Sequence, residues 1–219
     1  MKKVLASVLV VAVLGGASYL LGWSSFFSVK SLVVVGAPTQ EETTAVLQVA
    51  DVKKGEKLAR IETRVVLNSL SRISWVDHSR LSRDWLHQRV TIQVWPRIPI
   101  ARHGFNLVDI SGVEFTLPNN EGANLPVLDS NGSDSLKFAV TLLRQLPGTL
   151  TTQLESITTR GTTSATLFLL NGKNPLKIIW GDETDTALKV QVYQALLALP
   201  ENAKISLMDV SAPHAPIVK

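Results

Sequence analysis

Val29-Lys-Ser-Leu-Val-Val-Val-Gly36 is followed closely by Thr39-Gln-Glu-Glu42, and this stretch decides how the first domain folds. The β-branched run ends at Gly36 and Pro38, which predicts a strand followed by a turn. The second part has the pattern of a capping box, in which the Thr39 hydroxyl accepts from an early backbone N–H and Glu42 reaches back. A helix is therefore predicted to begin at Thr39.

The following residues extend this unit to the order β-α-α-β-β. Apolar residues recur at helical spacing between Thr63 and Leu70, which predicts a second helix. Two β-rich runs, Ile73 to Leu81 and Val90 to Trp95, predict a hairpin that Pro96 closes. We expect this first domain to cover residues 26–97.

Beyond Pro96 the sequence changes to short apolar runs separated by Gly, Pro and Asn, a pattern typical of antiparallel sheet. The predicted strands are Leu107 to Ile110, Val113 to Leu117, Ile157 to Thr159, Thr166 to Leu170 and Leu176 to Trp180. Helices are predicted at Ser135 to Gln145 and Asp185 to Leu199, and a last strand is predicted to start at Asp209 to Ser211. The fold class is therefore α+β, with a mostly antiparallel β domain and flanking helices over residues 98–219.

The N-terminal run from Val4 to Leu21 carries no charge and would reach about 27 Å as a helix. That length nearly crosses the hydrocarbon core of a bilayer, so a transmembrane helix is predicted at residues 4–23. Lys2 and Lys3, in the short tail 1–3, are expected in the cytoplasm by the positive-inside rule, which places the rest of the chain outside. The residues expected to contact lipid in the membrane are Val4, Leu5, Leu9, Val13, Leu14, Leu20 and Leu21.

A cleaved signal peptide is the alternative interpretation of this run. Gly15 and Ala17 occupy small-residue positions of a cleavage site after a lysine-led apolar stretch. The stretch is longer than the usual apolar region of a signal peptide and stays apolar to Leu21, which favours an uncleaved anchor. Both interpretations export the folded part of the chain.

Motifs for catalysis or cofactor binding are missing from the sequence. The chain has no cysteine, and its four histidines, His78, His87, His103 and His214, lack the spacing of a zinc site and are interpreted as surface residues. It contains no serine-hydrolase elbow, Walker loop or dinucleotide-binding glycine pattern. The net charge of +4 is scattered, which gives little support for nucleic-acid binding. We therefore expect no cofactor, no metal, no small-molecule substrate and no enzymatic activity.

Two acidic clusters have simpler interpretations than a metal or catalytic site. Residues Asp129 to Asp134 alternate oxygen ligands like a calcium loop, but Asp134 and Val140 stand where that loop needs glycine and a bidentate Glu. A polar turn is expected there. The carboxylates of Asp182 to Asp185 immediately precede a predicted helix, so favourable interaction with the helix dipole and N-capping explain them.

A set of basic and aromatic residues surrounds the predicted hairpin. Such a set can contact anionic lipid headgroups or cell-wall polymer, but a solvated strand face with tryptophans in the core is favoured. Its members are Arg72, Arg80, Arg83, Arg89, Arg97 and Arg102, with Trp75, Trp85 and Trp95.

A series of short motifs follows one order along nearly the whole chain. They are Phe26-Phe27-Ser-Val29-Lys30 with Val35-Gly36, Gly55 with Leu58 and Ile61, Trp75-Val76 with Arg83 and Trp85, Pro96-Arg97-Ile98-Pro99-Ile100-Ala101, Leu107-Val108-Asp109 with Gly112, Leu125 to Leu128, and Trp180-Gly181, Lys189 and Asp209-Val210-Ser211. In this order they resemble the bacterial cell-division FtsQ/DivIB family. The resemblance implies a single membrane helix, a POTRA domain and a β domain.

The resemblance also implies a function. Members of the family are expected to be non-catalytic divisome scaffolds of the cytoplasmic membrane, with the bulk of the chain extracytoplasmic at the division septum. They join FtsB and FtsL and help to recruit and regulate the septal peptidoglycan synthase complex. The family's C-terminal edge accepts a strand of FtsB, and the matching edge runs from Asp209 to about Val218. The expected partner-binding residues are Asp209, Val210, Ser211, Ala212, His214, Ala215 and Ile217.

Two other functions stay open from the sequence. The β-α-α-β-β order alone also fits an exported POTRA module that acts like a chaperone in polypeptide transport or assembly. Scattered carboxylates in the second domain leave an extracytoplasmic cell-wall enzyme as a further alternative.

Overall fold

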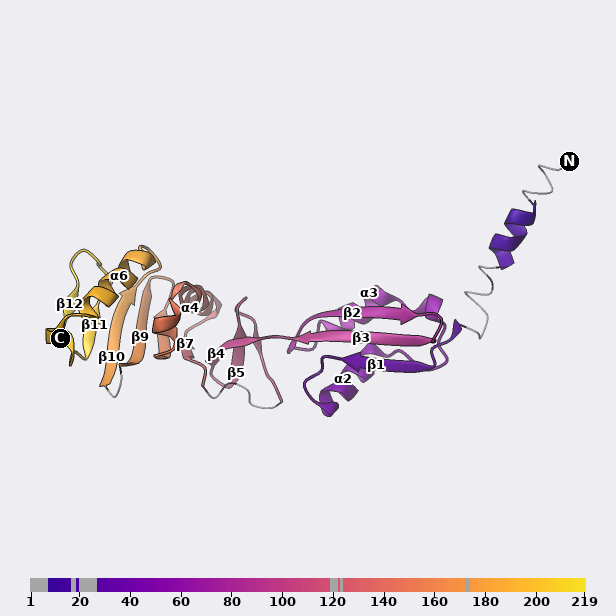
Figure 1. Ribbon diagram of the computed structural model, residues 1–219, viewed down its shortest axis with the longest axis horizontal. Coiled ribbons are helices and arrows are strands. Elements are labelled where there is room, and N and C mark those ends of the chain that lie inside the picture. Colours follow the sequence, from indigo (N-terminus) through magenta and orange to yellow (C-terminus); the bar gives the residue numbers. More distant parts are fainter. Residues whose placement is uncertain (1–7, 17–18, 20–26, 119–121, 123, 172–173) are drawn as a thin grey trace. The chain divides into compact units, whose positions relative to one another are not determined.

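The computed structural model describes residues 8–16, 19, 27–118, 122, 124–171 and 174–219 (Figure 1). The chain forms two compact units, Met1–Arg97 and Ile98–Lys219, which we call unit 1 and unit 2. Each unit combines helices with a β-sheet, so the predicted α+β class is confirmed.

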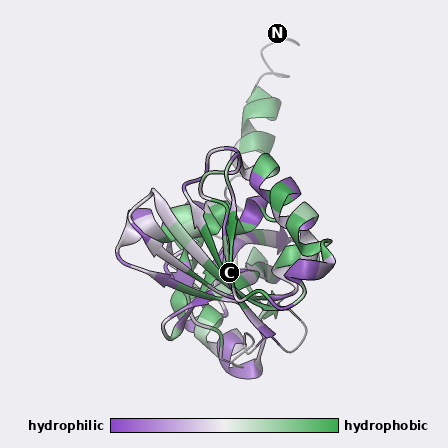
Figure 2. Ribbon diagram, turned by 90° about the vertical axis from the view of Figure 1, so that its left-hand side faces the viewer, coloured by the Kyte–Doolittle hydropathy of each residue, from purple (hydrophilic) through white to green (hydrophobic). Residues whose placement is uncertain are grey.

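The N-terminal segment is helical over residues 8–16, and Figure 2 shows it in the green of hydrophobic residues. Leu9, Val13 and Leu14, predicted to contact lipid, are exposed. Among the described residues, no helix combines the length and the apolar character that crossing a membrane requires. The predictions made for Lys2, Lys3, Val4, Leu5, Ala17, Leu20, Leu21 and Phe26 lie outside the described residues.

Unit 1 contains a three-stranded sheet with the strand order β1-β3-β2, in which β1 is parallel and β2 antiparallel to β3. Its elements are β1 (Ser31–Val35), α2 (Gln40–Ala50), the 3-10 helix η2 (Leu58–Arg60), α3 (Thr63–Leu70), β2 (Val76–Asp84) and β3 (Arg89–Pro96). Val90, Ile92 and Val94 alternate along β3 and are buried, because side chains on a strand point to opposite faces in turn. Val46 and Ala50 of α2 and Val66 and Leu70 of α3 are buried as well, so the strand and both helices contribute to the core of unit 1.

Helix α2 begins where the capping box predicts, but only half of that box forms. Thr39 precedes α2, and its Oγ1 accepts a hydrogen bond from the backbone N–H of Glu42 at 3.1 Å. The Glu42 carboxylate does not close the box: its Oε2 accepts from the indole Nε1 of the buried Trp75 at 2.5 Å. The side chain that a local pattern assigns to a helix cap therefore binds a residue far along the chain.

The predicted helix Thr63 to Leu70 is confirmed as α3. The next strand was predicted to start at Ile73, and this start is wrong. Residues 71–75 form turns that end α3, with Ser71 N–H donating to the Leu67 carbonyl and Ile73 N–H to the Leu70 carbonyl. The strand β2 therefore starts at Val76 and runs on to Asp84.

Unit 2 is built on a sheet that has nine strands within the described residues, in the order β12-β11-β10-β9-β8-β7-β4-β5-β6. The strands are β4 (Pro99–His103), β5 (Asn106–Asp109), β6 (Glu114–Phe115), β7 (Val127–Ser130), β8 (Leu154–Arg160), β9 (Ser164–Asn171), β10 (Asn174–Gly181), β11 (Leu207–Asp209) and β12 (Ile217–Val218). The helices are α4 (Ser133–Gln145), α5 (Gly148–Thr151), α6 (Thr186–Leu197) and the 3-10 helix η3 (Pro200–Asn202). The core includes Trp180, Leu167 and Leu142, all fully buried.

Antiparallel pairs predominate in this sheet, as predicted, but three pairs are parallel: β4 with β7, β7 with β8, and β10 with β11. Two of the parallel pairs follow from the helices, because a parallel strand needs a crossover connection. The segment with α4 and α5 joins β7 to β8, and the segment with α6 and η3 joins β10 to β11.

The five predicted strands of unit 2 overlap β5, β6, β8, β9 and β10, and the two predicted helices overlap α4 and α6. The last prediction is wrong, because Asp209 to Ser211 ends a strand rather than starting one. The Asp209 Oδ1 accepts hydrogen bonds from the Ser211 N–H at 3.0 Å and hydroxyl at 2.7 Å, which turns the chain away.

The Glu42–Trp75 hydrogen bond generates a stability prediction. Glu42→Ala leaves the buried indole N–H without an acceptor and is expected to lower the free energy of unfolding by about 1–3 kcal/mol. Glu41→Ala is the matched control, because Glu41 is an exposed acid in the same first turn of α2 and makes the same contribution to the helix dipole. Urea unfolding followed by tryptophan fluorescence measures both; equal losses would contradict the assigned role of Glu42.

Candidate partner-binding edge

One end of the unit 2 sheet is formed by the two-residue strand β12. β11 pairs in parallel with β10, placing Met208 beside Ile178, and β12 pairs antiparallel with β11, placing Val218 beside Met208. Because β12 is the terminal strand in the sheet order, its outer side faces no further strand of the described chain. The edge that can receive a partner is therefore β12.

The hydrogen-bond pattern decides which backbone groups of β12 point outward. Leu207 and Lys219 exchange both bonds, with N···O distances of 3.1 and 3.0 Å. In an antiparallel pair such hydrogen-bonded residues alternate with residues whose N–H and C=O point the other way. Val218, one residue before Lys219, therefore directs its N–H and C=O away from β11. Pro216, two residues earlier, has no N–H to offer on that side.

The predicted partner-binding residues divide into three groups. Ile217 lies in the edge strand β12, and Asp209 lies beside it in β11, one strand inside the edge. Val210 is fully buried, and its N–H donates to the Ile179 carbonyl of β10 at 2.9 Å, which makes its backbone donor part of the sheet. Ser211, Ala212, His214 and Ala215 lie in the exposed turn between β11 and β12.

The turn between β11 and β12 rests on the end of β10. Gly181 has a φ of +77°, and a Cβ added there would lie 3.0 Å from the Cβ of Ser211. A side chain at this position would need both an unfavourable backbone conformation and a shift of the turn. The position of the edge therefore depends on a glycine at the end of β10.

A buried lysine holds the loop that follows Gly181. Lys189 in α6 is fully buried, and its Nζ donates to the backbone carbonyl and to Oδ1 of Asp182, both at 3.0 Å. Hydrogen bonds from the Thr184 hydroxyl and then from Lys189 lower the pKa of Asp182 to about 2. The predicted N-capping by this acidic cluster is wrong, because Asp185 caps α6 without a side-chain hydrogen bond and Asp182 binds lysine instead.

The edge expected from the sequence reaches Val218 but does not single it out as a binding residue, and the structural role of Lys189 was not predicted. The outward direction of the Val218 N–H depends on the pairing register between β12 and β11. That register cannot be predicted from the sequence, because an irregular turn separates the two strands. Lys189 carried a signal, since a lysine within an apolar helical segment is an exception to the rule that charged residues stay exposed.

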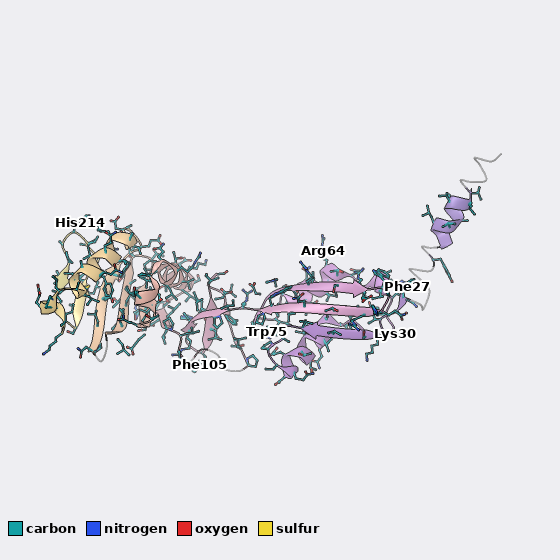
Figure 3. All side chains as sticks on the ribbon, in the orientation of Figure 1. Phe27, Lys30, Arg64, Trp75, Phe105 and His214 are labelled. Carbon is teal, nitrogen blue, oxygen red and sulfur yellow. The ribbon has the colours of Figure 1, made fainter. Side chains whose placement is uncertain are left out.

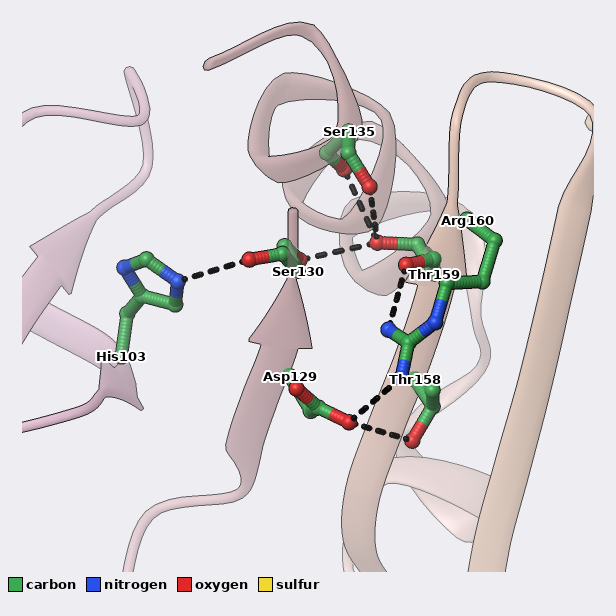
Figure 4. Close-up of polar contacts among 7 residues, drawn as sticks. All are labelled: His103, Asp129, Ser130, Ser135, Thr158, Thr159 and Arg160. Atoms are coloured by element: carbon green, nitrogen blue, oxygen red, sulfur yellow. Dashed lines mark hydrogen bonds and ion pairs between the residues drawn. The ribbon is translucent and has the colours of Figure 1, made fainter. Parts of the chain in front are cut away.

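A second polar cluster joins the middle strands of the same sheet (Figure 4). The hydroxyl of the buried Thr159 lies 2.8 Å from the hydroxyls of both Ser130 and Ser135, which ties β8 to β7 and α4. His103 at the end of β4 contacts the Glu114 carboxylate through Nδ1 at 2.9 Å and the Ser130 carbonyl through Nε2 at 3.3 Å. His103 is therefore not the free surface residue that its sequence suggested.

The His103 contacts favour the charged imidazolium, because both partners are acceptors and a neutral ring has only one N–H. The hydrogen bond with Glu114 raises the pKa of His103, with a smaller contribution from the Ser130 carbonyl, and burial opposes the shift. The same hydrogen bond lowers the pKa of Glu114. Asp129 is the other charged group that acts on the ring.

The fold and this edge define a class of protein, an α+β module whose sheet ends in a short strand that can accept another strand. The family model described as "Cell division protein FtsQ/DivIB, C-terminal" matches residues 97–211, more than half of the chain. The chain therefore belongs to the FtsQ/DivIB family, a family of non-enzymatic cell-division proteins, which confirms the resemblance seen in the sequence. No curated protein matches the chain. The match ends at Ser211, before β12.

The Lys189–Asp182 contact generates a prediction about the order of the edge. Lys189→Met keeps an unbranched side chain up to the ε-carbon position but removes both hydrogen bonds made by Nζ, so the loop after Gly181 loses its support for the turn at Ser211. The backbone amides of Leu207, Val210 and Lys219 are expected to exchange with solvent roughly tenfold faster. Lys204→Met, at an exposed position, serves as the control, and hydrogen-exchange mass spectrometry makes the comparison. Unchanged exchange would contradict this supporting role.

The His103–Glu114 pair generates a pH prediction. A raised histidine pKa stabilises the fold fully below the unfolded value of about 6.5, and this contribution is lost as the pH rises through the folded value. A lowered Glu114 pKa contributes above the unfolded value of about 4.3 and is lost as the pH falls. His103→Gln is therefore expected to cost most stability near about pH 5.5 and less near about pH 8.5. Urea unfolding at both pH values tests this; a cost independent of pH would refute it.

Proposed function

We propose that this chain is a non-catalytic divisome scaffold of the cytoplasmic membrane that joins FtsB and FtsL at the septum. Through these partners it helps to recruit and regulate septal peptidoglycan synthesis. Membership of the FtsQ/DivIB family supports a cell-division role. The terminal strand β12 supports a role in binding another chain.

The observation that carries the proposal is the outward direction of the Val218 N–H and C=O at the end of the sheet. A strand of FtsB would add beside β12 and satisfy these groups, which contributes affinity through main-chain hydrogen bonds. Pro216 removes a donor two residues away, so the register of the added strand is set at Val218. The exposed turn from Ser211 to Ala215 would supply side-chain contacts next to the added strand.

Features of unit 1 support two further parts of the proposal, recruitment to the division site and anchoring in the membrane. Its order of strands and helices and its β1-β3-β2 sheet are those expected of a POTRA domain, which we assign to recruitment to the division site. The uncharged run from Val4 to Leu21 would anchor this domain as a single membrane-spanning helix, with the N-terminus in the cytoplasm.

Substitution of Val218 tests the proposal. Val218→Pro removes the outward N–H but no hydrogen bond to β11, so unit 2 is expected to stay folded while FtsB binding falls at least tenfold. Val218→Ala is the matched control, because it removes most of the side chain and keeps the N–H. Binding is measured by pull-down of FtsB with the full chain, and division is measured by microscopy after each variant replaces the wild-type protein.

If the proposed function is right, FtsB binding and cell division should change together in these variants. Val218→Pro should produce filamentous cells with weak FtsB capture, whereas Val218→Ala should divide normally. Equal FtsB capture by the two variants would refute docking at β12. Normal septa after depletion of the protein would refute the division role itself.

A further inference from the structure

One end of unit 1 gathers three segments around the point where the chain enters β1. Val29 N–H donates to the Glu56 carbonyl and Gly55 N–H to the Val29 carbonyl, both at 2.8 Å. Lys30 N–H donates to the Gln88 carbonyl, also at 2.8 Å. Figure 3 shows Phe27 and Lys30 at this end of the three-stranded sheet and Trp75 at the other end. We call residues 27–30, 53–57 and 85–89 together the Leu86 surface.

The centre of the Leu86 surface is apolar and projects outward. Leu86, in the turn between β2 and β3, is 87% exposed. Next to it, the half-buried Trp85 ring meets Phe27 edge to face, with 5.9 Å between ring centroids. The turn is braced by the Asp84 carboxylate, which accepts from the His87 backbone N–H at 3.0 Å and lies 2.7 Å from its Nδ1. This bracing keeps Leu86 directed away from the sheet.

The three segments of the Leu86 surface also carry several basic residues. Two of the nearby acids already accept local backbone hydrogen bonds, Asp84 from His87 and Glu56 from the N–H of Lys53 at 3.2 Å. Asp51, the third acid, lies 3.5 Å from the Lys53 ammonium. The basic residues on or beside the surface are Lys30, Lys53, Lys54, Lys57 and Arg89, and they outnumber the acids. The surface is therefore complementary to a negatively charged layer.

The chain itself limits how far this surface can lie from the apolar N-terminal run. Phe27 follows Leu21 by only six positions, and even a fully extended segment of that length spans at most roughly 20 Å. Tryptophan and exposed aliphatic side chains flanked by lysines are favoured at the headgroup level of bilayers. If the run from Val4 to Leu21 is in the membrane, the Leu86 surface is within reach of the headgroups.

We propose that the Leu86 surface docks on the anionic phospholipid headgroups of the bilayer that anchors the chain. Leu86 and Trp85 enter the interface, and the lysines around them contact phosphate groups. This inference rests on the membrane anchoring in the proposed function and adds a second contact, which restricts the orientation of unit 1 relative to the membrane.

A fluorescent label at Leu86 tests the docking. The chain contains no cysteine, so Leu86→Cys provides a unique attachment point for an environment-sensitive fluorophore. Phe105→Cys is the matched control, because Phe105 is a fully exposed apolar residue in the turn between β4 and β5 of unit 2. The labelled full-length chains are reconstituted into vesicles of phosphatidylcholine with or without phosphatidylglycerol.

The expected result depends on both the labelled position and the lipid. The label at Leu86 should shift to shorter emission wavelength and be quenched by spin-labelled lipid in vesicles with phosphatidylglycerol. High salt should reverse both effects, because screening weakens the lysine contacts. Water-like emission at Leu86 in these vesicles, or equal quenching at Leu86 and Phe105, would overturn the proposal.

A charge variant gives an independent measurement. Lys53→Gln combined with Lys54→Gln should reduce the ratio of docked to undocked protein about fivefold per lysine. Lys204→Gln, an exposed lysine of unit 2, should leave this ratio unchanged. Equal effects of the two changes would overturn the assignment of the lysines to the surface.

Flotation of the vesicles separates failure of the anchor from failure of the docking. A full-length chain that does not float with the vesicles would overturn membrane anchoring, and with it this part of the proposed function. A chain that floats but keeps Leu86 in water would overturn only the docking of the Leu86 surface.

Discussion

The backbone groups on the outer side of a terminal strand have no neighbouring strand to satisfy them, and the architecture of unit 2 depends on this constraint. Its sheet ends in β12 at one side and in β6 at the other, and each of these strands has only two residues. Short terminal strands limit uncontrolled pairing with other chains. At β12 one residue, Val218, still presents a donor and an acceptor between a proline and the hydrogen-bonded Lys219, so pairing there is confined to one register.

Buried polar contacts hold the elements that position this edge. Lys189 fixes the loop after β10, Gly181 lets the following turn lie against that loop, and Val210 joins the turn to the sheet. Elsewhere Thr159 connects β8 to β7 and α4, and Glu42 connects α2 to Trp75 in unit 1. In each case a polar group that would be costly to bury alone has a partner from another element, so the contact also specifies how the elements pack.

The role proposed for this chain depends on backbone edges and surfaces instead of reactive side chains. The FtsQ/DivIB family to which the chain belongs is non-enzymatic, and the features of interest here are a strand end and an apolar turn among lysines. The two features lie in different units, β12 in unit 2 and Leu86 in unit 1. The proposed partner binding and the proposed membrane contact can therefore be tested by separate substitutions.

Local patterns were sufficient to predict the α+β class, the Thr39 cap, the helix from Thr63 to Leu70 and most strands of unit 2, because these depend on residues close in sequence. The hydrogen-bond partners of three residues could not be predicted, because each partner is distant in sequence. Glu42 binds Trp75, His103 binds Glu114, and Val210 binds Ile179. The family resemblance pointed to a sheet edge near the C-terminus, and the sheet does end there, in β12. The outward direction of the Val218 backbone groups could not be predicted, because it depends on how β12 pairs with β11. The sequence by itself determined the fold class, most of the helices and strands, and the family to which the chain belongs, but not β4, β7 or the start of β2. Only the tertiary structure decided which backbone groups stay available, because hydrogen-bond direction in a sheet is set by pairing between segments and not by any one segment alone.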